Sequence, residues 1–179
     1  MLFEINVRLT DDDYLKFNEF LLIRSYYGKK QMMNRRILIA LITLIIGAVV
    51  SFRYGLSDAL LFLSIYCFVM AIYQIFLNKL TQRSIRRRIK FLKKKGKLKY
   101  SPESVMRFYD DVLSEITPDE KTERKYSALE RVSIVGDVVY IHINVISAYI
   151  IPRASFESDE QYKAFLEFIK TKFENIDVY

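Results

Sequence analysis

Residues 37–52 read ILIALITLIIGAVVSF, and residues 59–77 read ALLFLSIYCFVMAIYQIFL. Neither run contains a charged side chain, and a helix needs roughly 20 apolar residues to cross the hydrocarbon core of a bilayer. The first run is a little short for a full span. Flanking side chains that extend their polar ends to the membrane interface, or local thinning of the bilayer, can accommodate the difference. The connection at 53–58 is long enough only to turn the chain back. We therefore expect a two-helix transmembrane hairpin over residues 35–78, with a buried core helix as the alternative for the first run.

Basic residues surround the two chain ends of this hairpin but not its turn. Five Lys and Arg side chains lie between Arg24 and Arg36, and eleven lie between Lys79 and Lys99. The turn offers Arg53 alone. Because Lys and Arg near the membrane ends are retained in the cytoplasm, we expect a multi-pass protein of the cell membrane with both termini cytoplasmic.

The net charge of +7 is unevenly distributed over the 179 residues. Residues 1–100 carry nineteen Lys and Arg against six Asp and Glu, whereas residues 101–179 carry nine against fifteen. Since the basic half adjoins the apolar runs and the other half is acidic, anionic lipid headgroups are the expected partner and nucleic acid is not.

A chain of this length has room for one modest globular unit beside the anchor.

Residues 79–99 are expected to continue the second span as a basic juxtamembrane helix. Ile85, Ile89 and Leu92 recur there at helical spacing, and Gly96 is a suitable helix stop. The expected contacts with anionic lipid are Arg83, Arg86, Arg87, Arg88, Lys90, Lys93, Lys94 and Lys95. A merely solvated stop-transfer segment is the alternative.

Small residues predict how the two spans pack, because close approach of helices in lipid depends on small side chains. The predicted packing residues are Ala40, Thr43, Gly47 and Ser51 in the first span and Ala59, Ser64, Cys67 and Ala71 in the second. An antiparallel register pairs Ala40 with Ala71, Thr43 with Cys67, Gly47 with Ser64, and Ser51 with Ala59. Chance alignment of residues that are common in membrane helices is the alternative.

Residues 1–34 are expected to form a strand and an amphipathic helix. Apolar residues alternate with polar ones over 3–9, which is typical of a half-buried strand that needs a partner sheet. Thr10 and the three Asp residues after it favour a helix start, and apolar spacing supports a helix to about Arg24. Residues 25–34 are polar and only loosely patterned.

Residues 100–179 are expected to form a meandering antiparallel sheet that one helix closes. Strand-like runs occupy 105–109, 112–117, 124–135, 138–144 and 148–151, with turn residues at 110–111, 118–119 and 136–137. Residues 158–161 form a capping box, and an apolar helix face follows, made of Tyr162, Phe165, Leu166, Ile169 and Phe173. The whole chain is thus expected to be a membrane α+β protein.

The order of these parts resembles the YcxB-like family of small bacterial membrane proteins. The resemblance rests on the opening strand, residues 9–14, the paired spans, and three tail segments, at 126–129, Tyr140 and 148–156. It implies that residues 100–179 are similar to bacterial pleckstrin-homology (PH) folds, with a curved sheet of about seven strands capped by one helix. Relatives often have Trp where Tyr126 stands, and this chain has no Trp.

No residue pattern in the sequence indicates catalysis or a cofactor. His142 is the sole histidine, which we expect on the surface face of a strand, and the lone Cys67 excludes a disulfide within one chain. A phosphate-binding glycine loop is also absent. We therefore expect a non-catalytic, membrane-anchored interaction module that binds a protein partner at the cytoplasmic face. One alternative is a subunit of an oligomeric membrane enzyme or transporter, and another is a structural protein that acts through lipid packing. The chain could also form a homo-oligomer.

Overall fold

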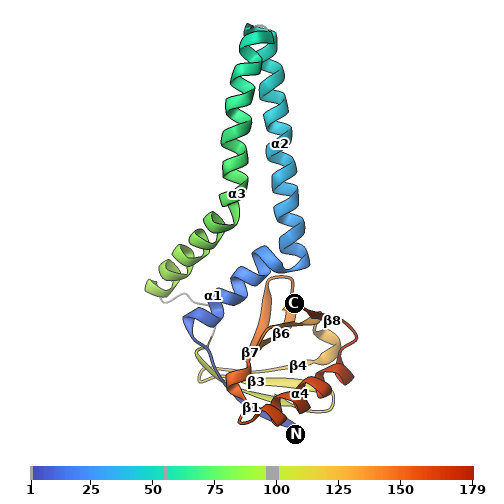
Figure 1. The fold of residues 1–179 in the computed structure, drawn as a ribbon. Coiled ribbons are helices and arrows are strands. Elements are labelled where there is room, and N and C mark those ends of the chain that lie inside the picture. The colour runs from blue at the N-terminus through green and yellow to red at the C-terminus, as the bar shows by residue number, and fades with distance from the viewer. Residues whose placement is uncertain (1, 55, 96–100) are drawn as a thin grey trace. The chain divides into compact units, whose positions relative to one another are not determined.

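The computed structural model describes residues 2–54, 56–95 and 101–179, and Figure 1 shows their helices and strands. The chain folds as two units, one of which interrupts the other in sequence. The sheet unit joins Met1–Phe17 to Leu98–Tyr179, and the hairpin unit is Asn18–Lys97. Residues 1–34 and 100–179 were expected to be separate parts. Instead the first seventeen residues belong with the C-terminal half.

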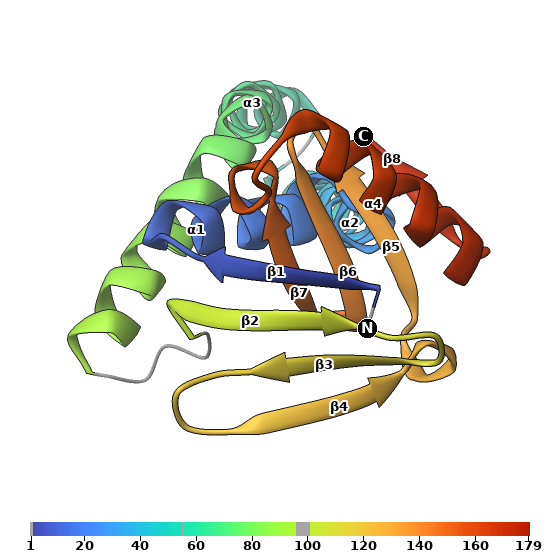
Figure 2. The ribbon, with the colours of Figure 1, turned by 90° about the horizontal axis from the view of Figure 1, so that it is seen from below.

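The first sheet has the order β1-β2-β3-β4 and is antiparallel throughout (Figure 2). Its strands are β1 (Phe3–Arg8), β2 (Glu103–Phe108), β3 (Val112–Ile116) and β4 (Lys121–Lys125). β1 is the alternating strand that the sequence predicts, and Ile5 and Val7 are buried on one of its faces. Its partner is β2, about a hundred residues away, with Phe3 opposite Phe108 and Arg8 opposite Glu103.

The second sheet has the order β7-β6-β5-β8. Its strands are β5 (Arg131–Val135), β6 (Val138–Asn144), β7 (Ser147–Pro152) and β8 (Ile176–Val178), and β8 pairs with β5 in parallel. The expected single run over 124–135 is wrong. A short 3₁₀ turn, η2 (Tyr126–Ala128), divides it, because Tyr126 is buried and its hydroxyl donates to the carbonyl oxygen of Tyr109 (2.9 Å). The chain changes sheets at this anchored tyrosine, so one continuous meander does not form.

The helix α4 (Asp159–Lys172) begins at the predicted cap. Ser158 Oγ accepts a hydrogen bond from the Gln161 amide (3.2 Å), and Gln161 Oε1 accepts one from the Glu157 amide (2.7 Å). Phe165 and Ile169 are fully buried on its inner face. The Phe165 ring meets Phe108 edge-on at a centroid distance of 4.9 Å, so aromatic packing joins α4 to the first sheet.

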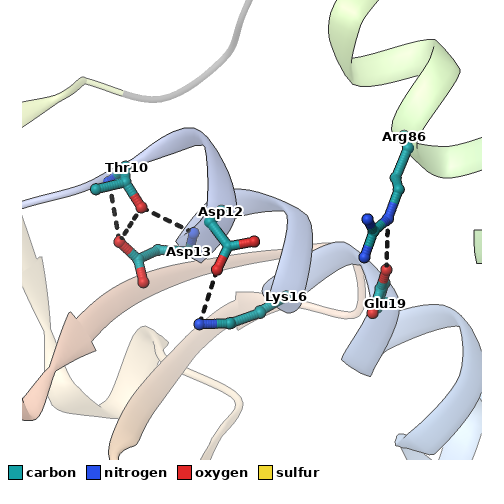
Figure 3. A network of polar contacts seen from close by, with 6 residues as sticks. All are labelled: Thr10, Asp12, Asp13, Lys16, Glu19 and Arg86. Carbon is teal, nitrogen blue, oxygen red and sulfur yellow. Dashed lines mark hydrogen bonds and ion pairs between the residues drawn. The ribbon is translucent and has the colours of Figure 1, made fainter.

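The helix α1 (Asp11–Glu19) also starts where the sequence predicts (Figure 3). Thr10 Oγ1 accepts from the Asp13 amide (3.2 Å), and Asp13 Oδ2 accepts from the Thr10 amide (2.9 Å), which is a reciprocal cap. Phe17 is buried, and its ring lies 5.1 Å from that of Tyr140 on β6. The helix therefore covers the face of β6 that points away from the main core.

The helix α2 (Tyr26–Tyr54) begins within residues 25–34, whose loose pattern gave no prediction of where a helix would start. A π-helical turn, η1 (Phe20–Arg24), ends at Ser25, whose hydroxyl donates to the Leu21 carbonyl (2.6 Å) and accepts from the Gly28 amide (3.0 Å). Ser25 thus ends one helix and caps the next. A Cβ at Gly28 would collide with the Leu21 carbonyl oxygen, so this corner requires glycine.

α2 and α3 (Leu56–Lys94) run side by side in opposite directions (Figure 1). As expected, α3 continues without interruption from the apolar run into the basic segment. Leu63–Leu77 and Lys79–Lys94 are bent by 51° relative to each other, which the sequence did not predict. The proposed helix stop at Gly96 lies outside the described residues.

Candidate membrane-contact surface

One helix of the hairpin unit has the length and composition of a membrane span. Among the described residues, Tyr26–Arg53 meets this test: its most apolar stretch of 18 residues has a mean hydropathy of 2.1, and only 6% of that stretch is buried. Leu63–Leu77 and Lys79–Lys94 meet it only as a bent pair. The structure therefore contains one candidate span close to the N-terminus.

Both helices carry large apolar side chains that are exposed. On α2 they are Ile37, Leu38, Leu41, Ile42, Leu44, Ile45, Ile46, Val49 and Phe52. On α3 they are Leu60, Leu61, Ile65, Phe68, Val69, Ile72, Ile75, Phe76 and Leu80. Soluble monomers rarely expose contiguous apolar patches beyond a few hundred Å². This surface therefore needs an apolar environment to cover it.

The predicted small-residue register of the hairpin needs correction. Gly47 is buried, and a Cβ there would lie 2.9 Å from Leu63 Cδ1, so Leu63 rather than Ser64 faces it. Thr43 and Ser51 are half-buried on the same face of α2, whereas Ala40 is exposed. On α3, Ser64, Cys67 and Ala71 are all exposed. The side chain of Ala59 lies outside the described residues.

Large residues occupy the inward positions of α3. They are Leu63, Tyr66, Met70, Tyr73, Gln74 and Leu77, all buried or half-buried. Tyr73 also accepts a hydrogen bond from Arg35 of α2 (3.2 Å). Small residues on α2 thus leave room for large side chains on α3. The sequence argument failed because it required both helices to contribute small residues.

All eight basic residues predicted to contact lipid are exposed; seven lie on the second part of α3, and Lys95 directly follows its last residue. Ile85 and Ile89 are buried on the opposite face, as their spacing predicts. Arg86 forms an ion pair with Glu19 across a 3.6 Å separation (Figure 3). One member of the predicted set therefore already has an acidic partner within the hairpin unit.

Comparison with known families identifies part of the sheet unit. Residues 108–169, from the last residue of β2 to α4, match the model described as YcxB-like protein. Over these residues, which we call the YcxB-like region, the chain is similar to that family. All three tail segments on which the resemblance rested lie within the YcxB-like region, and the opening strand and the hairpin lie outside it. Comparison with curated proteins and with solved structures gave no match.

Within the YcxB-like region, the expectation for His142 is wrong. The side chain is fully buried, not on the surface, and it shares a 3.0 Å hydrogen bond with the hydroxyl of Ser133. Burial, together with the nearby charge of Arg131, lowers the pKa of His142 to about 4. Its face of β6 also carries Tyr140, which Phe17 of α1 covers. The run of apolar residues around it, typical of a strand buried on both faces, was the signal that could have revealed this burial.

The YcxB-like region and its neighbours also border a shallow hollow. Asn6, Arg8, Glu103, Ser104 and Thr117 contribute polar side chains to its wall. Its two charged members, Arg8 and Glu103, pair with each other at 3.6 Å, which leaves no net charge there to select a ligand. Among the described residues, no group of three or more His, Cys, Asp or Glu side chains could hold a metal ion.

Proposed function

We propose that α2 and α3 cross a membrane as a hairpin and hold the sheet unit at its cytoplasmic face, where that unit binds a protein partner without catalysing a reaction. The exposed apolar side chains on both helices carry this proposal. Leaving such side chains in water forgoes about 1.5–3 kcal/mol each, a cost that a lipid environment removes. The Lys and Arg asymmetry about the hairpin supports the orientation.

The order of elements in the sheet unit supports a PH-like fold. Seven strands, β1 to β7, divide between two sheets and are followed by α4. This agrees with the roughly seven strands and one closing helix that the family resemblance implies. On this proposal the hairpin is inserted between the first and second strands of the PH-like unit, and β8 is an addition to the second sheet.

Cysteine labelling tests the topology. Single cysteines replace Ser57 and Ser158 in chains that also carry Cys67→Ser, and intact cells are treated with a membrane-impermeant thiol reagent. We expect position 57 to react and position 158 to react only after the cells are permeabilised. Reaction at 158 in intact cells, with none at 57, would contradict the proposed orientation.

Affinity purification from native membranes tests the binding role. The full chain is compared with a chimera in which the hairpin unit carries an unrelated soluble domain in place of the sheet unit. A protein that the full chain retains and the chimera loses supports the proposal that the sheet unit binds a protein partner. Two results would instead favour a subunit of an oligomeric enzyme or transporter. In one, only further copies of this chain are recovered; in the other, the chimera retains the same partner through its hairpin unit.

A further inference from the structure

The second part of α3 has two opposite faces of different chemistry. Ile85 and Ile89 are buried on one face, and Leu92 is half-buried beside them. At 3.6 residues per turn, the opposite face is formed by residues spaced four, three and four apart. These are the exposed side chains of Arg83, Arg87, Lys90 and Lys94, which we call the basic stripe.

Two apolar side chains border the basic stripe. Leu80 is 43% exposed and Phe91 is 56% exposed, and helical geometry places both on the same edge of the stripe. The ammonium group of Lys95 lies 4.5 Å from the centre of the Phe91 ring. Exposed apolar groups beside clustered cations are typical of helices that lie at a membrane interface.

The other four of the eight predicted lipid contacts flank the stripe. Arg86 and Lys93 lie on one side of it, and Arg88 and Lys95 lie on the other. Arg86 is held by Glu19 at 3.6 Å, so part of its charge is compensated. The eight predicted lipid contacts are therefore not equivalent.

The bend of α3 brings the whole stripe close to the bilayer. A segment of this length extends roughly 24 Å along its own axis. Turned by 51° from the preceding span, it reaches only about 15 Å beyond that span when the span is upright. A headgroup layer of about 5–8 Å and a Debye length of about 8 Å together cover that depth.

We propose that the basic stripe, with Leu80 and Phe91, is a docking surface for the anionic phospholipid headgroups of the membrane that the hairpin crosses. The inference rests on the proposed function. Charge complementarity and direct continuity with the span favour lipid over a soluble polyanion. The two apolar side chains also match a lipid interface, whereas a nucleic-acid backbone offers them no partner.

The chain contains no tryptophan, so a single introduced Trp can serve as a fluorescent probe. Phe91→Trp introduces a single indole into the full-length protein, which is reconstituted in nanodiscs of neutral phosphatidylcholine or of phosphatidylcholine mixed with phosphatidylglycerol. We expect the emission of this indole to shift to shorter wavelength, and to be quenched by brominated acyl chains, in the anionic discs. Identical emission in both discs would overturn the inference.

Two charge-matched variants test the role of the stripe itself. In chains that also carry Phe91→Trp, one variant replaces Arg83, Arg87, Lys90 and Lys94 by Gln, and the other replaces Arg86, Arg88, Lys93 and Lys95 by Gln. Each loses four charges, and Gln keeps a similar helix propensity. We expect only the stripe variant to lose the shift. Equal loss of the emission shift in both variants would show that the segment is attracted to anionic lipid by its total charge and not through a defined surface, which would contradict the proposal.

Further arms of the experiment separate the remaining outcomes. RNA or heparin is added to the protein in neutral discs, and a shift equal to that in anionic discs would replace lipid by a soluble polyanion as the partner. Protection of Cys67, which lies in the second apolar run, from a water-soluble thiol reagent checks insertion in the same discs. A chain that fails to insert contradicts the proposed function, whereas an inserted chain without a shift contradicts only this inference.

Discussion

At the scale of single residues, His142 shows how burial determines the ionisation of a side chain. Its pKa of about 4 lies below the ordinary value of 6.5, because a charged imidazole would lose its hydration in the sheet unit. Between these two pH values the unfolded chain binds the proton and the folded chain does not. Stability is therefore complete above about pH 6.5 and is lost as the pH falls towards 4.

We expect this histidine to account for up to roughly 3 kcal/mol of stability lost over that range. The measurement is the melting temperature of the full chain as a function of pH, for the wild type and for His142→Gln. The variant should show a flatter profile, since its side chain does not titrate. Ser133→Ala serves as the control, because it removes the hydrogen bond but leaves the buried imidazole. Parallel profiles for wild type and His142→Gln would contradict this account.

At the scale of elements, the packing of α2 on α3 depends on the absence of a side chain at Gly47. A Cβ at this position would meet Leu63 at 2.9 Å, so a larger side chain has no space. We expect Gly47→Leu to destabilise the hairpin unit by about 1–3 kcal/mol, as overpacking usually does. The measurement is thermal unfolding of the protein in detergent or nanodiscs.

Ala48→Leu is the matched control, because Ala48 is exposed on the same helix one residue away. It should leave the melting temperature nearly unchanged. Disulfide formation gives a second reading in chains that carry Cys67→Ser. Cysteines at Gly47 and Leu63 should crosslink faster than cysteines at Gly47 and Ser64. The reverse order of rates would restore the register that the small residues suggested.

At the scale of the whole molecule, the hairpin unit interrupts the sheet unit after its first strand and helix. Ile5, Val7 and Phe17 all precede the hairpin, and all are buried within the sheet unit. We therefore expect residues 101–179 alone to fail to fold. Without β1 the edge of β2 is unpaired, and part of the core is absent.

Joining residues 1–17 to residues 101–179 through a flexible glycine–serine linker should restore a folded, monomeric domain. Circular dichroism and amide dispersion in NMR spectra would show this. The same fusion with Val7→Asp is the control and should remain unfolded, because it buries a charge in the core. A well-folded 101–179 fragment without residues 1–17 would show that β1 is dispensable.

The sequence by itself determined the features that depend on neighbouring residues. The caps at Thr10 and Ser158, the helical apolar and basic runs, and most strand positions follow from side chains a few residues apart. Of the candidate surface, the apolar runs and the exposed basic helix were also predicted. Local hydrogen bonds and periodicity are sufficient for such features, because they do not depend on which distant segments meet.

Only the tertiary structure decided which distant segments meet. Four features join residues far apart in the chain: β1 pairs with β2, β8 is added in parallel, the chain changes sheets at Tyr126, and His142 is buried beneath α1. The same holds for Leu63 opposite Gly47 and for the Arg86–Glu19 pair. Each depends on the shape and charge of a partner surface that exists only after the chain has folded, so no local pattern in the sequence identifies the partner segment.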